Sequence, residues 1–507
     1  MNGSMTMVDK ERRRALRALG ATGLIGLAGC TGNGDGGDGS DGGSDGSNDG
    51  SDGGGSDGGG GDGGSTPTET SGSNGGSQDA VSWWNLAVQG TAKEAAAELA
   101  SMFEEETDIP VEQTKYENTP YKSAITNALG TSESPDVFYI WPGPNRLGRY
   151  VGNENVLDLD DLLTEDQRSA QIPDAIRGTQ YEEGEILSWR SEEGGMFAIP
   201  YDVAGITLWY NKTVLEDAGV DIDRIQHATD VTWDEFLDIC STLQDAGYTP
   251  IQCGNRNRWA IGHWISAFMI KAVGVDTYYD AAFGLNDVSF TDERFVTAME
   301  RLKQLHDDNY LNRDINSLNN NEAASLFFNG QAGFWHQGTW VTEQISSQAP
   351  DSFGGVPDEM DYMWWPAFPD LYDNSANERM SVVPNSTVAI SAQAAERGEE
   401  HLQDAMDFAQ FFGSYEAQKR YFEITGSPVT RTDVYEEMDL DATQETLTST
   451  LNQMETADAI GMVFDVAFLP EATETLLSGG QELFTDGDAA TVLENLQETN
   501  EEALSDL

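Results

Sequence analysis

The segment Gly194–Gly247 carries the clearest fold signals in the chain, and it reads GGMFAIPYDVAGITLWYNKTVLEDAGVDIDRIQHATDVTWDEFLDICSTLQDAG. Its run Ile206–Tyr210 is short, apolar and rich in β-branched or aromatic residues, which predicts a strand buried on both faces. Pro200 fixes its own φ and biases Ile199 toward extended backbone, so a defined crossing is expected at Pro200–Asp202. We therefore expect an arm that leaves one lobe and starts the sheet of a second lobe.

A helix is expected directly after this arm. Thr232 and Glu235 have the spacing of a capping box, and Gly247 supplies a helix stop. Apolar residues recur at helical spacing between these signals, namely Trp233, Phe236, Leu237, Cys240 and Leu243. The segment therefore predicts a strand followed by an amphipathic helix.

Strand and helix patterns alternate along the chain from about Ala80 onward. The expected strands are 81–84, 135–141, 250–253, 363–369 and 381–390, the expected helices are 92–103 and 405–421, and a helix, turn and strand are expected over 323–340. A third crossing is expected near 427–433. This alternation implies α/β lobes with a mainly parallel sheet, whose ligands lie outside the carboxyl ends of the strands. Trp84 and Trp141 are thereby placed at the mouth of a cleft.

The chain is strongly acidic. Its 507 residues include 27 Lys or Arg and 88 Asp or Glu, which gives a formal net charge of −61. The length allows two lobes with separate cores, and 12 Trp and 20 Phe argue against disorder in the main part. So negative a surface repels nucleic-acid phosphate, and it repels itself unless salt of about 1 M shortens the screening length to roughly 3 Å. The composition excludes nucleic acid as a partner and indicates a salt-adapted protein, as in halophilic archaea.

Residues 1–30 are expected to be a signal peptide that directs export. A positive region precedes and overlaps the apolar stretch Ala15–Ala28, which is too short to span a bilayer. Leu27–Cys30 resembles the lipobox of prokaryotic lipoproteins, which implies lipidation of Cys30. Arg13–Leu16 resembles the twin-arginine signal imperfectly, so that route and the general secretory route both stay open. A cleaved secretory protein is the alternative if Cys30 is not modified.

Residues 31–79 are dominated by Gly, Asp, Ser and Thr and contain no Lys or Arg. Such a segment cannot bury enough apolar surface to offset its ordering entropy, so a disordered tether is expected. Its repeated Asp-Gly pairs suggest a calcium repeat as an alternative. The pairs are irregularly spaced and lack the apolar position that calcium-binding repeats need.

Several segments together resemble one known family. The motifs AIPYD, LWYNK and TWDEF, the segment PDVFYIW followed by NRLGRYV, and AASLFFNGQAGFWHQGTW are similar to the extracellular solute-binding proteins of ABC importers, sugar and maltodextrin type (family 1). The resemblance implies a periplasmic-binding-protein-like α/β fold with two lobes and three hinge crossings around a central cleft. It places the first lobe at 80–200 plus 384–430 and the second at 201–383 plus 431–507. Ala204 stands where some maltodextrin binders have a carboxylate, so the ligand need not be maltodextrin.

The candidate ligand-binding residues follow from this resemblance and from strand-end positions. They are Trp84, Trp141, Asn145, Arg146, Asp202, Asn257, Trp259, Trp264, Gly338, Trp340, Trp365 and Phe468. A pyranose has apolar faces and a hydroxyl rim, so its site needs flat aromatic platforms together with polar side chains. Core packing is the alternative for any single Trp, and about half of them are expected to be structural.

Signals of catalysis are weak. The five His residues form no H-E-x-x-H pattern, and the chain has no G-x-S-x-G elbow and no Walker loop, so no catalytic residue, metal or cofactor is expected. A secreted glycosidase using Glu182 and Glu183, or Asp361, is one alternative. Cys240 and Cys253 are expected to be buried small hydrophobes, with a disulfide between them as the other reading.

The favoured hypothesis is a monomeric, lipid-anchored binding protein on the extracellular face of the cell membrane. By resemblance it captures a sugar or oligosaccharide by hinge closure and delivers it to ABC permease subunits, with no covalent step. A protein of the same fold that binds a non-sugar solute, such as a glycerol phosphate ester, is a second alternative. Such a ligand would need convergent cations, for which Arg146, Arg256 and Arg258 are the candidates.

Overall fold

The computed structural model describes residues 80–88 and 90–507. The predictions for the signal peptide, the lipidation at Cys30 and the tether lie outside these residues. Within the described ranges, no helix combines the length and the apolar character needed to cross a membrane.

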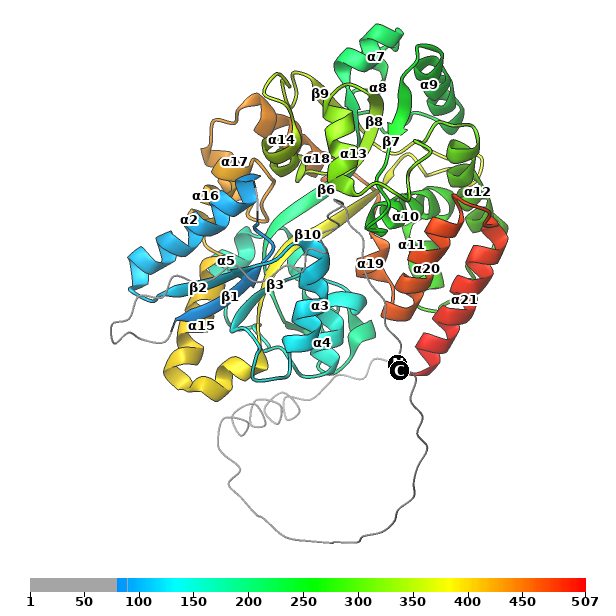
Figure 1. Cartoon of the computed structure of the whole chain (residues 1–507). Coiled ribbons are helices and arrows are strands. Elements are labelled where there is room, and N and C mark those ends of the chain that lie inside the picture. Colours follow the sequence, from blue (N-terminus) through cyan, green and yellow to red (C-terminus); the bar gives the residue numbers. More distant parts are fainter. Residues whose placement is uncertain (1–79, 89) are drawn as a thin grey trace, which may run out of the picture. The chain divides into compact units, whose positions relative to one another are not determined.

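A nine-stranded mixed sheet runs through the molecule (Figure 1) in the order β2-β1-β3-β10-β6-β8-β7, with β11 beside β10 and β9 beside β6. The strands are β1 (Val81–Asn85), β2 (Val111–Lys115), β3 (Val137–Ile140), β6 (Ile199–Asn211), β7 (Thr249–Gln252), β8 (Ala332–Gly338), β9 (Met360–Met363), β10 (Glu378–Ile390) and β11 (Ala459–Met462). A separate pair is formed by β4 (Gln180–Tyr181) and β5 (Gly195–Met196). β1 pairs in parallel with β2 and β3, as expected within a lobe, but β10 is antiparallel to β3 and β6. The whole sheet is therefore mixed, because the chain crosses between the lobes in both directions.

β6 and β10 are the hinge strands. The start of β6 pairs with β10, and its second half, Ile206–Tyr210, pairs with β8 on one side. β10 in turn pairs with β11 at its start and with β3 at its end. The third crossing lies beside them, since Val203 N donates to Pro428 O at 3.0 Å and Thr430 N to Tyr201 O at 3.3 Å. The three predicted crossings thus meet at the middle of the sheet.

We call β1, β2 and β3 with the helices around them the first lobe, and β7, β8 and β9 with theirs the second lobe. First-lobe helices and turns are α2 (Gly90–Thr107), α3 (Asn118–Ala128), η1 (Pro144–Gly148), α4 (Arg149–Gly152), α5 (Glu165–Ala170), α6 (Pro173–Arg177), η2 (Ile186–Ser188), η3 (Ala392–Arg397), α15 (Glu399–Phe411), α16 (Tyr415–Thr425) and α17 (Asp433–Glu437). Second-lobe helices are α7 (Lys212–Ala218), α8 (Ile222–Ile225), α9 (Trp233–Asp245), α10 (Trp259–Val273), α11 (Val275–Ala282), α12 (Glu293–Asp307), α13 (Asn320–Phe328), α14 (Val341–Gln348), α18 (Ala442–Glu455), α19 (Phe464–Ala467), α20 (Pro470–Glu482) and α21 (Ala489–Ser505). The exact lobe boundaries stay a prediction.

The segment Gly194–Gly247 behaves as predicted, with one extension. The strand spans all of β6, and each of its residues is buried. Thr232 and Glu235 form the capping box of α9, and Gly247 follows the helix with φ +92°. Trp233, Phe236, Cys240 and Leu243 are buried, whereas Leu237 is only half-buried. The crossing at Pro200 is therefore continuous with the strand instead of being a separate loop.

The helix predicted over 405–421 is in fact two helices. α15 ends at Phe411, and Ser414 caps α16 by accepting a hydrogen bond from the backbone N–H of Ala417. The apolar spacing continues across the break, which is why periodicity alone missed it. A capping serine and a preceding glycine, Gly413, were the local signals for two helices.

The core and the surface differ sharply in composition. α10 is mostly apolar, and Ala260–Val273 are all buried, so this helix forms the centre of the second-lobe core. Cys240 and Cys253 are buried and free, so the proposed disulfide is absent.

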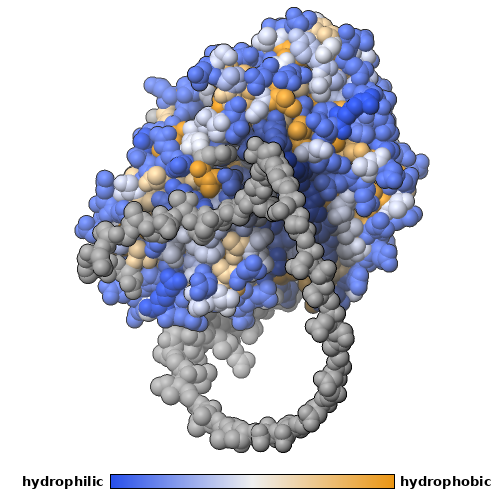
Figure 2. Space-filling model, in the orientation of Figure 1, coloured by the Kyte–Doolittle hydropathy of each residue, from blue (hydrophilic) through white to orange (hydrophobic). Residues whose placement is uncertain are grey.

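The face in Figure 2 is mostly hydrophilic, and only Leu187, Leu285 and Leu507 are large exposed apolar residues in the part of the chain that the structure describes.

Candidate ligand-binding cavity

A cavity of about 440 Å³ lies between the lobes at the hinge strands. The first lobe contributes Trp83, Asn85, Lys122, Tyr139 and Trp141. The hinge region and α16 contribute Tyr201, Asp202, Asn385, Ser386, Tyr421 and Ser427. The second lobe contributes Asn257, Trp259, His263, Trp340, Glu343 and Asp465. Because both lobes and the hinge supply the walls, the cavity exists only when these distant segments come together.

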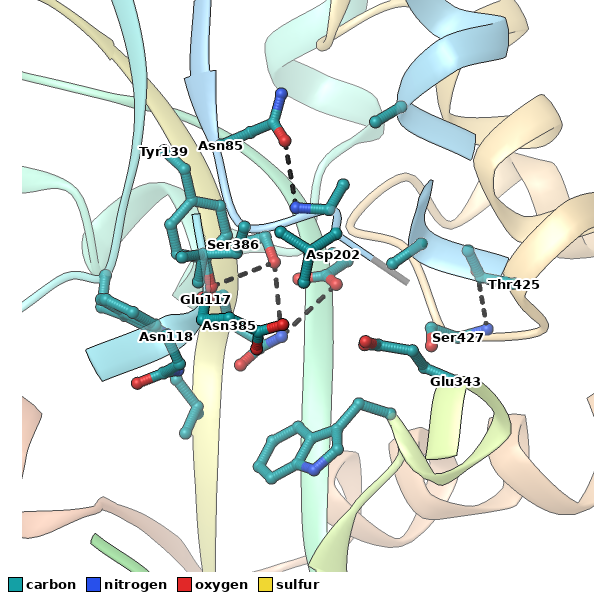
Figure 3. A pocket seen from close by; sticks show the side chains of 18 of the residues that line it. Asn85, Glu117, Asn118, Tyr139, Asp202, Glu343, Asn385, Ser386, Thr425 and Ser427 are labelled. Atoms are coloured by element: carbon teal, nitrogen blue, oxygen red, sulfur yellow. Dashed lines mark hydrogen bonds between the residues drawn. The ribbon is translucent and has the colours of Figure 1, made fainter. Parts of the chain in front are cut away.

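Asp202 provides a buried acceptor at the hinge. Asp202 is only 3 % exposed. Its Oδ2 accepts hydrogen bonds from Tyr421 Oη at 3.0 Å and from Asn385 Nδ2 at 3.4 Å. Oδ1 is buried as well and has no hydrogen-bond partner within residues 80–88 and 90–507. Figure 3 shows Asp202, Asn385 and Ser386 turned toward one another. One carboxylate oxygen is therefore buried without a hydrogen-bond partner in this part of the chain.

The environment of Asp202 changes its acidity. Burial raises the pKa of Asp202 to about 6, although hydrogen bonds from Ser386, Tyr421 and Asn385 act in the opposite direction. At neutral pH the group is an anion that neutral donors hold in place. Such an anion is a strong acceptor for a hydroxyl group.

Three partly exposed indoles provide apolar walls, namely Trp141, Trp259 and Trp340, and a fourth lining indole, Trp83, is only 2 % exposed. All three are half-buried, as a stacking platform must be. Trp141 meets Tyr139 edge-on with ring centroids 4.8 Å apart, and the rings of Trp259 and Trp340 are 6.5 Å apart at 69°. Trp340 Nε1 donates to Oε1 of Gln337 at 2.6 Å, which fixes the orientation of that ring.

An ion cluster joins the two lobes at one edge of the cavity. Asp465 Oδ2 lies 3.2 Å from Nη2 of Arg146 and 3.8 Å from Nζ of Lys122. Burial acts to raise the pKa of Asp465, but the charges of Arg146 and Lys122 outweigh it and hold that pKa below its ordinary value. Burial, assisted by Arg146, lowers the pKa of Lys122 to about 8, and burial lowers the pKa of His263 to about 4. Near pH 7 the cluster holds two cations, one anion and a neutral imidazole.

Further buried polar atoms of the lining lack partners in the described part of the protein. They are Trp83 Nε1, Thr91 Oγ1, His263 Nδ1, Thr342 Oγ1 and Gln344 Oε1, in addition to Asp202 Oδ1. Donors and acceptors are mixed in this set. Each of these atoms is buried, so they belong to the wall of the cavity and not to its accessible surface.

Five of the predicted site residues line the cavity, namely Trp141, Asp202, Asn257, Trp259 and Trp340. Gly338 lies behind Trp340: a Cβ there would fall 2.3 Å from a carbon of that ring, so the missing side chain makes room for the indole. Asn145 and Arg146 bind Asp465 and do not line the cavity. Their ligand-binding role, and that of the five lining residues, stays a prediction.

The structure corrects four assignments. Trp264, Trp365 and Phe468 are 1 %, 2 % and 0 % exposed and lie in the second-lobe core, where Trp264 and Trp365 contact each other with centroids 4.6 Å apart. Phe468 packs against Tyr278 and Phe290. Position near a strand end does not place these rings in the cleft, because the elements that carry them are buried on all sides.

Trp84 is the fourth predicted site residue that the structure places outside the cavity. Side chains alternate along β1, so Trp83 is only 2 % exposed and packs edge-on against Phe408 and Phe412. The half-buried ring of Trp84 packs against Tyr116 with centroids 5.1 Å apart. Of the two adjacent indoles at this strand end, only Trp83 is among the lining residues, and it is mostly packed into the core. The alternation of burial along the strand decides between them.

Sequence reasoning missed much of the polar lining. Tyr139 lies in β3, just before Trp141, and Asn385 and Ser386 lie in the predicted return strand. Their elements were therefore predicted, but the orientation of their side chains was not. Lys122 and Asp465 lie on short helices whose position at the cavity depends on the packing of the lobes. No local pattern marks these two residues.

The geometry does not favour the two alternatives. Arg146, Arg256 and Arg258 pair with Asp465, Glu322 and Glu474 respectively, and Lys122 is the single Lys or Arg among the described lining residues. Asp361 is fully buried and bonds Gln226 and His227, while Glu182 and Glu183 are exposed and outside the cavity. The three arginines named for a phosphate and the carboxylates named for glycoside hydrolysis are therefore not brought together at the cavity.

The fold and cavity define a two-lobed solute-binding protein. Residues 83–419 match the family of bacterial extracellular solute-binding proteins, and the chain belongs to this family.

Individual relatives agree with this assignment. An uncharacterized ABC transporter extracellular-binding protein of Pyrococcus horikoshii is 24 % identical over 356 residues, which cover 69 % of this chain and 71 % of the relative. A multiple sugar-binding protein of Streptococcus mutans is 22 % identical over 237 residues, covering 46 % of this chain and 51 % of the relative, so that match spans about half of its length. Among solved structures, a chitin oligosaccharide binding protein superimposes with a TM-score of 0.71 at 19 % identity, covering 84 % of this chain and 99 % of that one.

Proposed function

We propose that this protein captures a sugar or oligosaccharide between its lobes and delivers it to the permease subunits of an ABC importer. The carrying observation is the combination, in one interlobe cavity, of three half-buried indoles with the carboxylate of Asp202 and neighbouring polar side chains. Aromatic platforms suit the apolar faces of a pyranose, and the polar atoms suit its hydroxyl rim. The names of the sugar-binding relatives support the same ligand class.

The mechanism is hinge closure. β6, β10 and the segment 427–431 are the connections at the cavity, and the ligand would contact groups from both lobes at once. A ligand that gains contacts only when the lobes are together favours the closed state by the free energy of those contacts. No covalent step is needed, and we propose no catalytic activity and a monomeric protein.

A sugar panel tests this function. The full chain, in 2 M KCl, is mixed with maltose, xylobiose, chitobiose, raffinose and galactose, and its melting temperature and the release of reducing ends are measured. We expect at least one sugar to raise the melting temperature while remaining intact. Release of reducing ends would instead support a glycosidase, and a shift with glycerol 3-phosphate alone would support the phosphate-ester alternative.

We further propose that the protein is exported and held at the outer face of the membrane through lipid on Cys30. The support is the sequence Leu27–Cys30 after a positive and apolar leader, together with membership of an extracellular family. Cys30→Ser should release the protein into the medium, measured by immunoblotting of medium and membrane fractions. Cys240→Ser is a matched control, because that thiol is buried and free. Unchanged membrane retention of Cys30→Ser would rule out the lipid anchor.

A further inference from the structure

The turn η1 of the first lobe rests directly on α19 of the second lobe. Asn145 Nδ2 donates to the backbone oxygen of Asp465 at 3.3 Å and to Oγ1 of Thr473 at 3.4 Å. Gly143, just before η1, has φ +94°, and a Cβ on it would fall 1.8 Å from the backbone oxygen of Val466. Only a residue without a side chain permits this approach of two backbones. The two lobes are therefore fitted to each other at this edge.

The charged groups at this contact are largely withdrawn from solvent. The side chains of Arg146 and Asp465 are 16 % and 14 % exposed, and that of Lys122 is 25 % exposed. Arg146 and Lys122 come from the first lobe and Asp465 from the second. Without Asp465, the two cations would repel each other in a half-buried site, and burial would disfavour both. Asp465 of the second lobe therefore neutralises positive charge that belongs to the first lobe.

The same cations contact a wall of the cavity. Lys122 Nζ lies 5.1 Å and Arg146 Cζ 5.7 Å from the centroid of the Trp141 ring. Cations at this distance from an indole attract its π face and hold the ring in place. The contact with Asp465 is thus linked to the orientation of an indole that lines the cavity.

We propose that Asn145, Arg146, Lys122 and Asp465 form an interlobe latch that holds the closed state and fixes the Trp141 ring against the solute. This inference rests on the proposed function, and it assigns Asn145 and Arg146 to positioning instead of ligand contact. The latch forms only when the lobes meet, so it contributes to the closed state and not to the open one. Its largely buried ion pair is screened less than surface pairs, so it operates in molar salt.

The test compares isosteric and matched variants of the full chain in 2 M KCl. Asp465→Asn and Arg146→Gln each remove one charge of the latch, and the double variant removes both. Asp307→Asn is the control, because it deletes the same charge from an exposed second-lobe ion pair with Lys303. The readouts are the radius of gyration without sugar, and the dissociation rate of the sugar that raises the melting temperature of the wild type most in the panel above.

We expect Asp465→Asn and Arg146→Gln each to enlarge the radius of gyration and to speed sugar dissociation about tenfold. The double variant should be no worse than either single one, because both substitutions remove the same interaction. Asp307→Asn should match the wild type. Melting temperatures of the unliganded variants within a few degrees of the wild type show that the fold is retained.

Two results would overturn the latch. One is an unchanged radius of gyration in both single variants. The other is additive effects on dissociation, which would mean that Arg146 contacts the solute independently of Asp465. If no sugar in the panel binds the wild type, the proposed function fails, and the scattering comparison still decides whether Asp465 holds the lobes together.

Discussion

At the scale of single residues, exposure separates the indoles of the cavity from those of the core. Trp141, Trp259 and Trp340 are half-buried, while Trp264 and Trp365 are almost completely buried. The residue type is the same, so the sequence gives no direct signal of this difference. The surroundings of each ring decide whether it packs against protein or remains available to a solute.

Replacing Trp by Ala should therefore affect sugar binding at one position and stability at another. Trp340→Ala should weaken sugar binding by about 1 to 3 kcal/mol with little loss of stability, because the ring lines the cavity. Trp365→Ala should lower the free energy of unfolding by about 3 to 5 kcal/mol, because it leaves a hole in the core. Calorimetric titration and denaturant unfolding measure the two quantities. Equal affinities of Trp340→Ala and wild type would remove that ring from the binding site.

Asp202 carries a stability cost that depends on pH. The pKa of Asp202 in the folded state is about 6, above its ordinary value of 3.8. Below about pH 4 the carboxyl group is protonated in both states and its burial carries no charge penalty. As the pH rises through 6 the folded protein must hold a buried anion, so the free energy of unfolding decreases. Asp202→Asn should raise the free energy of unfolding at pH 7.5 by up to about 3 kcal/mol relative to wild type and should weaken sugar binding.

The difference between Asp202→Asn and wild type should shrink as the pH falls from 7.5 to 5. Denaturant titrations of both proteins at several pH values measure it. Asp307→Asn, at an exposed ion pair, controls for the change in net charge. A stability difference that is constant across this range would show that Asp202 does not titrate as its burial implies.

At the scale of secondary structure, local signals predict elements well where they agree with tertiary packing. Thr232 and Glu235 form the predicted capping box of α9, and the apolar stripe of this helix faces the core. The prediction of a single helix over 405–421 was wrong because the apolar spacing continues through Gly413 and Ser414, where the backbone turns. Periodicity reports the buried face, and only capping chemistry reports where a helix ends.

Removing the cap should destabilise α9 specifically. Thr232→Ala should lower the free energy of unfolding by about 1 kcal/mol, since the N–H of Glu235 loses its partner. Thr242→Ala, at an exposed position within the same helix, should have almost no effect. Chemical denaturation of both variants measures this, and equal losses would mean that the capping box does not stabilise the helix.

At the scale of the whole molecule, net charge governs the conditions for folding. A formal charge of −61 on 507 residues makes the compact state repel itself, and salt relieves this repulsion. The melting temperature should rise by tens of degrees from 0.1 to 2 M KCl. Sucrose is the control for general effects of cosolutes, since it carries no charge. A melting temperature independent of KCl would contradict the salt-adapted interpretation.

Local patterns predicted the α/β lobes, the crossing at Pro200 and the helix that follows it, and the resemblance to a known family supplied the other crossings. Strand alternation, the proline at the crossing and the capping box are local signals, and they need no knowledge of distant contacts. The sequence also named five residues that line the cavity, all near predicted strand ends or at the hinge.

The packing of the lobes determines which indoles face the cavity, and it brings Lys122 and Arg146 of one lobe to Asp465 of the other. These residues are separated by more than 300 positions, and their contact depends on how two lobes close over a hinge. Sequence patterns record the environment along one element, whereas the direction of a side chain and the pairing of distant charges depend on the packing of several elements at once.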